Sequence, residues 1–319
     1  MRNTLRLLLV LLAATVLTAQ AQDYPARLVR VIVPYPAGSL TDTLARLVAE
    51  RLALRWNQSV IVENRAGASG NVGAEAVAKA APDGYTLLFC PPAPYVMNKL
   101  LFAKLSYDPD AFAPVSVVAI APVVMMVNAN VAAADVRQLI AYAKANPDRL
   151  SYASSGVGGN PHLTAELFNS MAGVRILHVP YQGTAPALTA LLGGQIDILF
   201  DAVGAALPSV RAGKVKVLAV GSEKRSALLP DTPAMAEVLP GFAAAVWVAM
   251  AAPPKTPAAV VSRISSSIAE SVKQPDTAKR MLDLSFEPIG GTPAEMAQLM
   301  KQETERWSGI VRATGAKAE

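Results

Sequence analysis

Four loops of this 319-residue chain carry the residue types that could hold a small anion. Each follows a short β-branched run, the pattern of a strand that ends in a loop. In open α/β sheets, ligands bind beyond the carboxyl ends of strands, where amides at helix starts can meet a negative charge. The candidate ligand-binding residues are Tyr35, Ala37, Gly38, Ser39, Leu40, Thr41 and Asp42, then Pro92, then Ser155, Gly156, Gly158, Gly159, Asn160 and His162, and finally Asp201.

The first loop runs from Pro34 to Asp42. Gly38 permits close approach of the backbone to a ligand. Ser39 or Thr41 could cap the following helix or donate to a ligand, and the residue types leave both readings open. Tyr35 could lay its ring along a ligand or pack against its own loop.

The second loop, Ser154 to His162, carries three glycines and two serines, which favours ligand contact over a plain connection. A dinucleotide fingerprint fails because its last glycine would fall on Pro161. We therefore expect an anion-binding helix start with Asn160 at the N-cap and Pro161 at the first helical position. His162 is expected to hydrogen-bond loop backbone and His178 to be a satisfied structural residue.

The remaining two loops offer less. Asp201 follows the run Ile196 to Phe200, where its carboxylate could accept from a ligand or pin a backbone turn, and both readings stay open. The loop after Phe89 is rich in proline, including Pro92, and its one side-chain donor is Tyr95. Cys90 is expected to be a small buried residue.

Catalytic chemistry finds no support in the residue pattern. Two histidines and one cysteine cannot form a metal-ligand cluster of the usual spacing, and neither a nucleophile elbow nor a phosphate-binding Gly-Lys-Ser motif is present. We expect no enzyme activity, no cofactor and no metal. Ligand capture is the simpler function.

Alternation of short β-branched runs with helical patterns predicts an α/β fold with a mostly parallel sheet. Expected strands are 28–33, 60–63, 85–89, 151–153, 176–179, 196–200 and 216–220. Expected helices are one on which Leu44, Leu47, Val48 and Leu52 share a face, and those near 74–80, 136–145, 161–171, 185–192, 258–273, 276–282 and 293–312. The apolar stretch Val115 to Asn128, interrupted by Pro122, is longer than one small-domain strand and could cross between two lobes, with Val246 to Ala251 as the return.

The N-terminus has the features of a cleaved export signal: Arg2 and Arg6, an apolar core from Leu7 to Leu17, and a small-residue site ending at Ala21. Its apolar run is too short to span a bilayer. Roughly 300 residues remain after cleavage, a length at which single cores divide into two. We expect a signal peptide at 1–21, one lobe from 22–124 with 247–319, and a second lobe from 125–246.

The composition excludes two further classes. Basic residues are scattered singly despite a net charge of +5, so no nucleic-acid-binding face is expected. One cysteine excludes an internal disulfide, so stability must come from packing. No lipid-anchoring cysteine follows the cleavage site, and we expect an exported, periplasmic monomer.

The chain resembles the Bug-type periplasmic receptors of tripartite tricarboxylate transporters from about Tyr24 to the C-terminus. The motifs that carry the resemblance are Val33-Pro34-Tyr35-Pro36-Ala37-Gly38 with Asp42, Val62-Glu63-Asn64-Arg65, Ala81-Pro82-Asp83-Gly84-Tyr85, Tyr152-Ala153-Ser154-Ser155-Gly156 with His162-Leu163, His178-Val179-Pro180-Tyr181-Gln182-Gly183, Leu192-Gly193-Gly194-Gln195, Phe200-Asp201 and Leu229-Pro230-Asp231-Thr232-Pro233.

The resemblance implies a two-lobed type II periplasmic-binding-protein fold with a hinge of two crossing strands. It implies capture of a small carboxylate between the lobes by backbone amides and water, and delivery to the membrane subunits of a transporter. Two alternatives are a receptor that presents its ligand to a sensor protein and a periplasmic enzyme acting on a carboxylate.

The chain departs from the family pattern at several positions in the loops. Ser39 replaces a second glycine, Leu40 a small residue, Gly159 a hydroxyl residue and Ala202 an asparagine, while prolines including Pro92 stand where hydroxyl residues are frequent. Each change removes polarity or adds apolar bulk, so a second carboxylate would lack donors. We therefore expect a monocarboxylate, aromatic or aliphatic, rather than a tricarboxylate.

Overall fold

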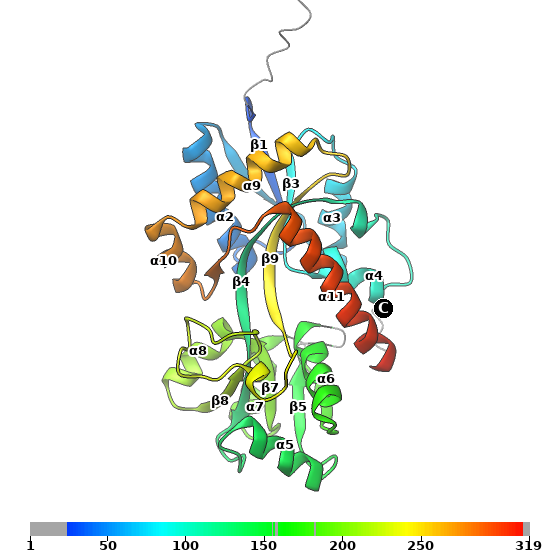
Figure 1. The fold of residues 1–319 in the computed structure, drawn as a ribbon, viewed down its shortest axis with the longest axis vertical. Helices are drawn as coiled ribbons and strands as arrows, with labels where there is room; N and C mark the ends of the chain where they lie inside the picture. The colour runs from blue at the N-terminus through cyan, green and yellow to red at the C-terminus, as the bar shows by residue number, and fades with distance from the viewer. Residues whose placement is uncertain (1–23, 155, 157–158, 182, 315–319) are drawn as a thin grey trace, which may run out of the picture.

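The computed structural model describes residues 24–154, 156, 159–181 and 183–314, so the predicted signal peptide and the candidates Ser155 and Gly158 lie outside it. The fold is α/β with two lobes joined by a pair of long strands, as Figure 1 shows. One sheet path runs through both lobes in the order β2-β1-β3-β9-β4-β7-β5-β6. The α/β class and the two-lobed arrangement confirm the prediction.

Lobe 1 is built on three parallel strands, β2 (Val60–Asn64), β1 (Val29–Val33) and β3 (Thr86–Cys90). Side chains alternate across the sheet. Val31 and Val33 join the core under α2 (Leu40–Trp56) and α9 (Ala258–Val272), whereas Ile32 joins the core beneath α3 (Asn71–Ala78). Both faces are therefore covered, which explains why these strands read as continuous apolar runs.

Lobe 2 repeats this plan with parallel strands β7 (Ile198–Ala202), β5 (Ser151–Ser154) and β6 (Leu177–Pro180). Its helices α5 (Val136–Ala145) and α6 (Asn160–Ala172) pack on the core of one face. Helices α7 (Thr184–Leu192) and α8 (Val203–Arg211) cover the other. The helix α8 was not predicted, because Gly204 and Pro208 interrupt its helical pattern.

The two lobes are joined by β4 (Ala113–Asn128) and β9 (Ala245–Ala252), which pair antiparallel. The predicted crossing by the stretch Val115 to Asn128 is confirmed: β4 is 16 residues long and includes Pro122 without a break. Pro122 pairs with Ala245, the first residue of β9, so the missing N–H falls where that ladder ends.

The sheet is parallel within each lobe and antiparallel at its centre. Strands β3, β7, β8 (Val215–Val220) and β10 (Glu287–Pro288) each run antiparallel to a crossing strand. The expectation of a mostly parallel sheet therefore holds only for β1 with β2 and β3 in lobe 1 and for β5 with β6 and β7 in lobe 2. A chain that crosses between lobes and returns must place its two crossings in opposite directions.

The last helices return to lobe 1, as predicted, but one of them also contacts lobe 2. Helix α10 (Pro275–Asp283) packs near β10 and α9, while α11 (Pro293–Thr314) packs against β4 and against α6 of lobe 2 (Figure 1). The short helical segments are η1 (Ala68–Gly70), η2 (Ala93–Met97), α4 (Asn98–Leu101), η3 (Pro109–Ala111) and η4 (Met235–Glu237).

The predicted lobe boundaries, 22–124 with 247–319 and 125–246, stay predictions. Among the residues that the structure describes, no helix has both the length and the hydropathy needed to cross a bilayer.

Candidate functional site

The topology makes the carboxyl ends of the strands in the two lobes face each other. Strands β1 and β3 run parallel to β4, and β3 ends at Cys90, level with Val117 of β4 through their common neighbour Ala249. Strand β7 runs the opposite way and ends at Ala202, level with Val123 of β4. Six residues of β4 separate these ends, or about 20 Å at 3.3 Å per residue. The predicted loops of both lobes leave their strands toward this gap.

Asp42 anchors the first loop. Its carboxylate accepts from the Gly38 N–H at 2.8 Å, from Arg46 Nε at 3.0 Å and from Asn64 Nδ2 at 2.8 Å, and its side chain is buried. Burial acts to raise the pKa of Asp42, but the hydrogen bonds from Arg46, Gly38 and Asn64 outweigh it and hold the pKa below its usual range. The carboxylate is thus occupied by its own loop.

Asn64 supports the site but is not among the candidate residues predicted from the sequence. Its Nδ2 donates to the Tyr35 carbonyl at 3.1 Å as well as to Asp42, so the end of β2 holds the loop after β1. The motif Val62-Glu63-Asn64-Arg65 pointed to this role, because an asparagine side chain at the end of one strand can hydrogen-bond the loop that follows the neighbouring strand.

Ser39 caps helix α2, accepting from the Asp42 N–H at 3.3 Å. The amides of Leu40 and Thr41, in the first turn, have no hydrogen-bond partner among the described residues. Leu40 is 52% exposed beside them. The helix start thus combines unpaired N–H groups with an exposed apolar side chain, an arrangement that suits an anion attached to an apolar body.

The surroundings of Tyr35 support a packing role for its ring rather than contact with a ligand. Its ring is partly buried and packs against both cores that flank lobe 1, and burial raises the pKa of its hydroxyl. Gly70, at φ +90°, lets η1 approach this ring: a Cβ there would stand 3.4 Å from the Tyr35 hydroxyl and 2.9 Å from Pro94.

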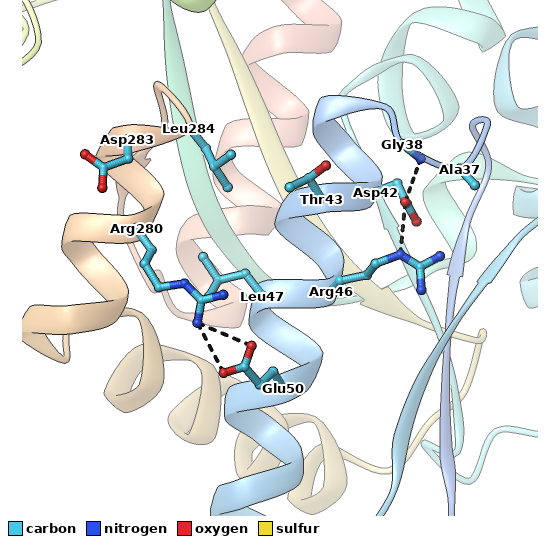
Figure 2. Close-up of a pocket in the computed structure, with 10 residues that line it drawn as sticks. All are labelled: Ala37, Gly38, Asp42, Thr43, Arg46, Leu47, Glu50, Arg280, Asp283 and Leu284. Atoms are coloured by element: carbon cyan, nitrogen blue, oxygen red, sulfur yellow. Dashed lines mark hydrogen bonds and ion pairs between the residues drawn. The ribbon is translucent and has the colours of Figure 1, made fainter.

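A pocket of about 660 Å³ opens beside the first loop, and Figure 2 shows it between α2 and α10. The residues that line it are Ala37, Gly38, Asp42, Thr43, Arg46, Leu47, Glu50, Arg280, Asp283 and Leu284. Its guanidinium groups are paired, Arg46 with Asp42 at 3.0 Å and Arg280 with Glu50 at 3.1 Å. All its lining residues belong to lobe 1, so this pocket brings together only the first-loop candidates.

The second loop begins from the end of β5, and its helix start differs by one residue from the prediction. Gly159, not Asn160, is the N-cap of α6, and Pro161 follows Asn160 inside the first turn. Asn160 Oδ1 accepts from the Thr164 hydroxyl at 3.4 Å, within its own helix. The prediction of an Asn160 cap is therefore wrong, because Gly159 supplies the extended backbone and the Asn160 side chain bonds along the helix.

His162 and His178 lie in one stack behind this loop. Their ring centroids are 4.1 Å apart with planes inclined by 12°, and Tyr152 stacks on His178 at 4.8 Å. Burial, followed by the charge of His162, lowers the pKa of His178 to about 4. Burial also lowers the pKa of His162, with Glu166 opposing it. The predicted hydrogen bond of His162 to loop backbone stays a prediction.

Asp201 is the last polar residue of β7, paired with Val124 of β4, and its side chain is buried. Oδ1 accepts from the Ala202 N–H at 2.7 Å, whereas Oδ2 is buried with no hydrogen-bond partner among the described residues. Burial raises the pKa of Asp201; the nearby Thr184 hydroxyl, which makes no hydrogen bond of ordinary geometry to Oδ2, and the Ala202 amide act against it. An unpaired buried oxygen at a facing strand end is available to a donor on a ligand or a water.

The proline loop after β3 forms the helical turn η2 rather than an open loop. Pro92 is buried at its start, and its carbonyl accepts from the Tyr95 and Val96 amides at 3.0 and 2.8 Å. Cys90 is buried, as predicted. In the described part of the chain, no group of three or more His, Cys, Asp or Glu side chains is placed to hold a metal ion.

The fold and facing loops define a class of protein, the two-lobed periplasmic binding proteins. MatC from Rhodopseudomonas palustris, solved with bound malate, is 34% identical and superposes with a TM-score of 0.72 over 90% of this chain and 100% of its own. Rpa4515 of R. palustris, solved with adipate, is 36% identical with a TM-score of 0.77 over 92% and 99% of the two chains.

Residues 44–316 match the model of the tripartite tricarboxylate transporter family receptor. BugT from Bordetella pertussis is 36% identical over 300 residues, which cover 93% of this chain and 92% of BugT. The chain therefore belongs to the tripartite tricarboxylate transporter receptor family, and the expected resemblance to Bug-type receptors is confirmed.

Proposed function

We propose that this receptor captures a small carboxylate between its lobes and releases it unchanged. The observation that carries the proposal is the start of α2, where the Leu40 and Thr41 amides are unpaired at the strand ends that face lobe 2. Asp201 lies at the facing strand end in lobe 2, and Gly159, the N-cap of α6, follows β5 there. A carboxylate that bridges the gap would favour hinge closure, because only the closed form lets both sets of groups contact it.

Several contacts must act together. Micromolar affinity corresponds to about 8 kcal/mol, whereas one helix terminus contributes only about 0.3 to 2 kcal/mol to an anion. Apolar burial and water-mediated hydrogen bonds supply the rest in this account. Calorimetry and mass spectrometry of one sample test capture without chemistry: a ligand that is bound and recovered with unchanged mass supports it, and a converted ligand contradicts it.

The ligand we favour has one carboxylate and an apolar remainder. Supporting this are exposed Leu40 beside the unpaired amides, the buried proline Pro92 at the end of β3, and Ala202 and Gly159, which add no side-chain donors. Rpa4515 was solved with adipate and MatC with malate. These two dicarboxylates make a useful test panel with the monocarboxylates hexanoate and benzoate and the tricarboxylate citrate. Thermal-shift and calorimetric ranking should place hexanoate or benzoate first, and tightest binding to citrate would overturn the monocarboxylate proposal.

We further propose export by cleavage after Ala21 and delivery of the ligand to the membrane subunits of a tripartite transporter. The family match to transporter receptors supports the partner, and the charge and hydropathy of residues 1–21 support export. N-terminal sequencing of the protein from periplasmic extract should begin at Gln22. Loss of uptake of the radiolabelled ligand after gene deletion would favour transport, whereas unchanged uptake with loss of a transcriptional response would favour a sensor partner.

A further inference from the structure

A side chain of β6 is hydrogen-bonded through Ser154 to Gly156, ahead of α6. Ser154, the last residue of β5, is fully buried, and its Oγ lies 2.7 Å from His178 Nε2. The same Oγ donates to the Gly156 carbonyl at 3.1 Å and accepts from the Gly156 N–H at 3.3 Å. One hydroxyl therefore joins the neighbouring strand to both polar groups of Gly156.

A serine hydroxyl has one proton, so Ser154 can donate to the Gly156 carbonyl or to His178 Nε2 but not to both. The Gly156 carbonyl lies 3.1 Å from Ser154 Oγ and can only accept, so we assign the proton to this bond. His178 Nε2 is then the donor to Ser154 Oγ, as in the neutral tautomer with the proton on Nε2. The chain of bonds runs from His178 Nε2–H to Ser154 Oγ–H to the Gly156 carbonyl.

This chain fixes a backbone conformation that needs support. Gly156 has φ +135°, a conformation that only glycine adopts readily. Its carbonyl also accepts from the Gly159 amide at 3.4 Å, and the Gly159 carbonyl accepts from Leu163 at 3.0 Å. The orientation of Gly156 is thereby linked to the first turn of α6.

The His178 ring stacks against two other aromatic rings. Its centroid lies 4.8 Å from that of Tyr152 in β5 and 4.1 Å from that of His162 in α6, and the Tyr152 hydroxyl donates to Glu166 Oε1 at 2.6 Å. The register of the strands brings two of these rings together, because Tyr152 of β5 pairs with His178 of β6. A ring held in this way can rotate little, so its Nε2 stays directed at Ser154.

We propose that His178 is a positioning residue of the ligand site in lobe 2, acting through Ser154 to hold Gly156 and the first turn of α6 in their binding conformation. The inference rests on the proposed function, since it assigns the start of α6 to the ligand. His178 does not contact the ligand in this account. A ring that only filled space would not need the neutral tautomer with the proton on Nε2.

The first test is the tautomer of the wild-type protein without a tag. The sequence has two histidines, so a long-range ¹H–¹⁵N spectrum contains two rings, which His162→Gln assigns. We expect His178 at pH 7 to be neutral with the proton on Nε2. A proton on Nδ1 alone would overturn the proposal, whether or not any ligand is known.

The second test compares His178→Gln with His178→Leu by calorimetry with hexanoate and adipate and by hydrogen–deuterium exchange of peptides that span 152–165. Gln places an amide N–H near the Nε2 position, whereas Leu leaves Ser154 without its donor. Leaving a buried group unpaired should weaken binding by about five- to a hundredfold and speed exchange in the peptides. His178→Gln should restore affinity to within about threefold, below the roughly 1 kcal/mol of one neutral hydrogen bond.

Leu177→Ala is the matched control, because Leu177 is the exposed neighbour on β6. It should leave affinity and exchange unchanged. Equal behaviour of the Gln and Leu variants, with both folded by circular dichroism, would overturn the positioning role. If the wild type bound neither carboxylate, the proposed function would fail, while the tautomer and the exchange pattern would still decide the role of His178.

Discussion

At the scale of single residues, the two carboxylates predicted for the site have opposite environments. Asp42 is surrounded by three donors and its pKa is lowered, whereas Asp201 has an unpaired oxygen and its pKa is raised. Asp42 therefore supports the loop after β1. Asp201 is buried at a cost to stability, which is a frequent property of functional groups.

Asp42→Asn should lower the free energy of unfolding at pH 7 by about 1 to 3 kcal/mol, because charge-assisted hydrogen bonds to Gly38, Arg46 and Asn64 weaken. A lowered folded pKa stabilises the protein above the unfolded value of about 3.9, and this contribution is lost as the pH falls through the folded pKa. Urea unfolding from pH 7 to 3 should show the wild type and variant converging below about pH 4. Exposed Asp283→Asn is the control, and a gap that stays constant with pH would contradict the account.

Asp201→Asn should have the opposite effect on the free protein. A raised folded pKa destabilises the fold as the pH rises above the unfolded value of about 3.9, so removing the charge should add roughly 1 kcal/mol at pH 7. The gain should vanish at pH 3, where both states are protonated. Affinity for a ligand that donates to Oδ2 should fall in calorimetry. A variant less stable than wild type at pH 7 would show that the carboxylate is paired and structural.

At the scale of elements, the sequence predicted most strands and helices but not all of their ends. Apolar periodicity identified β1, α2, β4 and β9, because burial in a sheet or helix face leaves a clear pattern. It could not identify α8, where Gly204 and Pro208 reduce helical propensity and tertiary packing decides the outcome.

The site could be predicted as a set of loops but not as a set of donors. Gly38 was expected to offer its backbone, yet its N–H is used by Asp42, and the unpaired amides are those of Leu40 and Thr41. The Leu40 and Thr41 amides stay unpaired because they lie in the first turn of α2. The Asp42 carboxylate that takes the Gly38 N–H is also held by Asn64, and this long-range bond could not be read from the local sequence.

Gly204, in the first turn of α8, allows the lobes to approach. A Cβ at this position would stand 3.1 Å from Ser285 Cβ and 3.2 Å from its Oγ, in the segment between α10 and β10. Gly204→Leu should hold the lobes apart and weaken carboxylate binding about tenfold or more, since overpacking costs about 1 to 3 kcal/mol. Small-angle scattering should show a larger radius of gyration with ligand present.

Gly309→Ala on α11 is the matched control for this wedge. A Cβ at Gly309 meets no atom within 4 Å, and the residue is helical. Alanine there should raise stability by about 0.5 to 1 kcal/mol through helix propensity. Binding and radius should not change; equal binding by Gly204→Leu and Gly309→Ala would contradict a functional approach of the lobes at Ser285.

At the scale of the whole molecule, the lobes touch on more than one side of the crossing strands. Glu287 of β10 accepts from the Ser226 hydroxyl at 2.5 Å and the Ala227 amide at 3.1 Å in lobe 2. Arg306 of α11 donates to the Ala243 carbonyl at 3.0 Å, just before β9. We expect these contacts between the lobes to restrict how far the lobes can separate.

The central claim is that a carboxylate group is what the two lobes recognise together. Isothermal titration calorimetry of the wild type with hexanoate, and with hexanamide of matching size, tests it most directly. We predict one-to-one binding of the carboxylate with a micromolar or lower Kd, which corresponds to a binding free energy of about 8 kcal/mol or more. The amide should bind at least a hundredfold more weakly. Equal affinity for the two compounds, or failure of every carboxylate in the panel to bind, would contradict it.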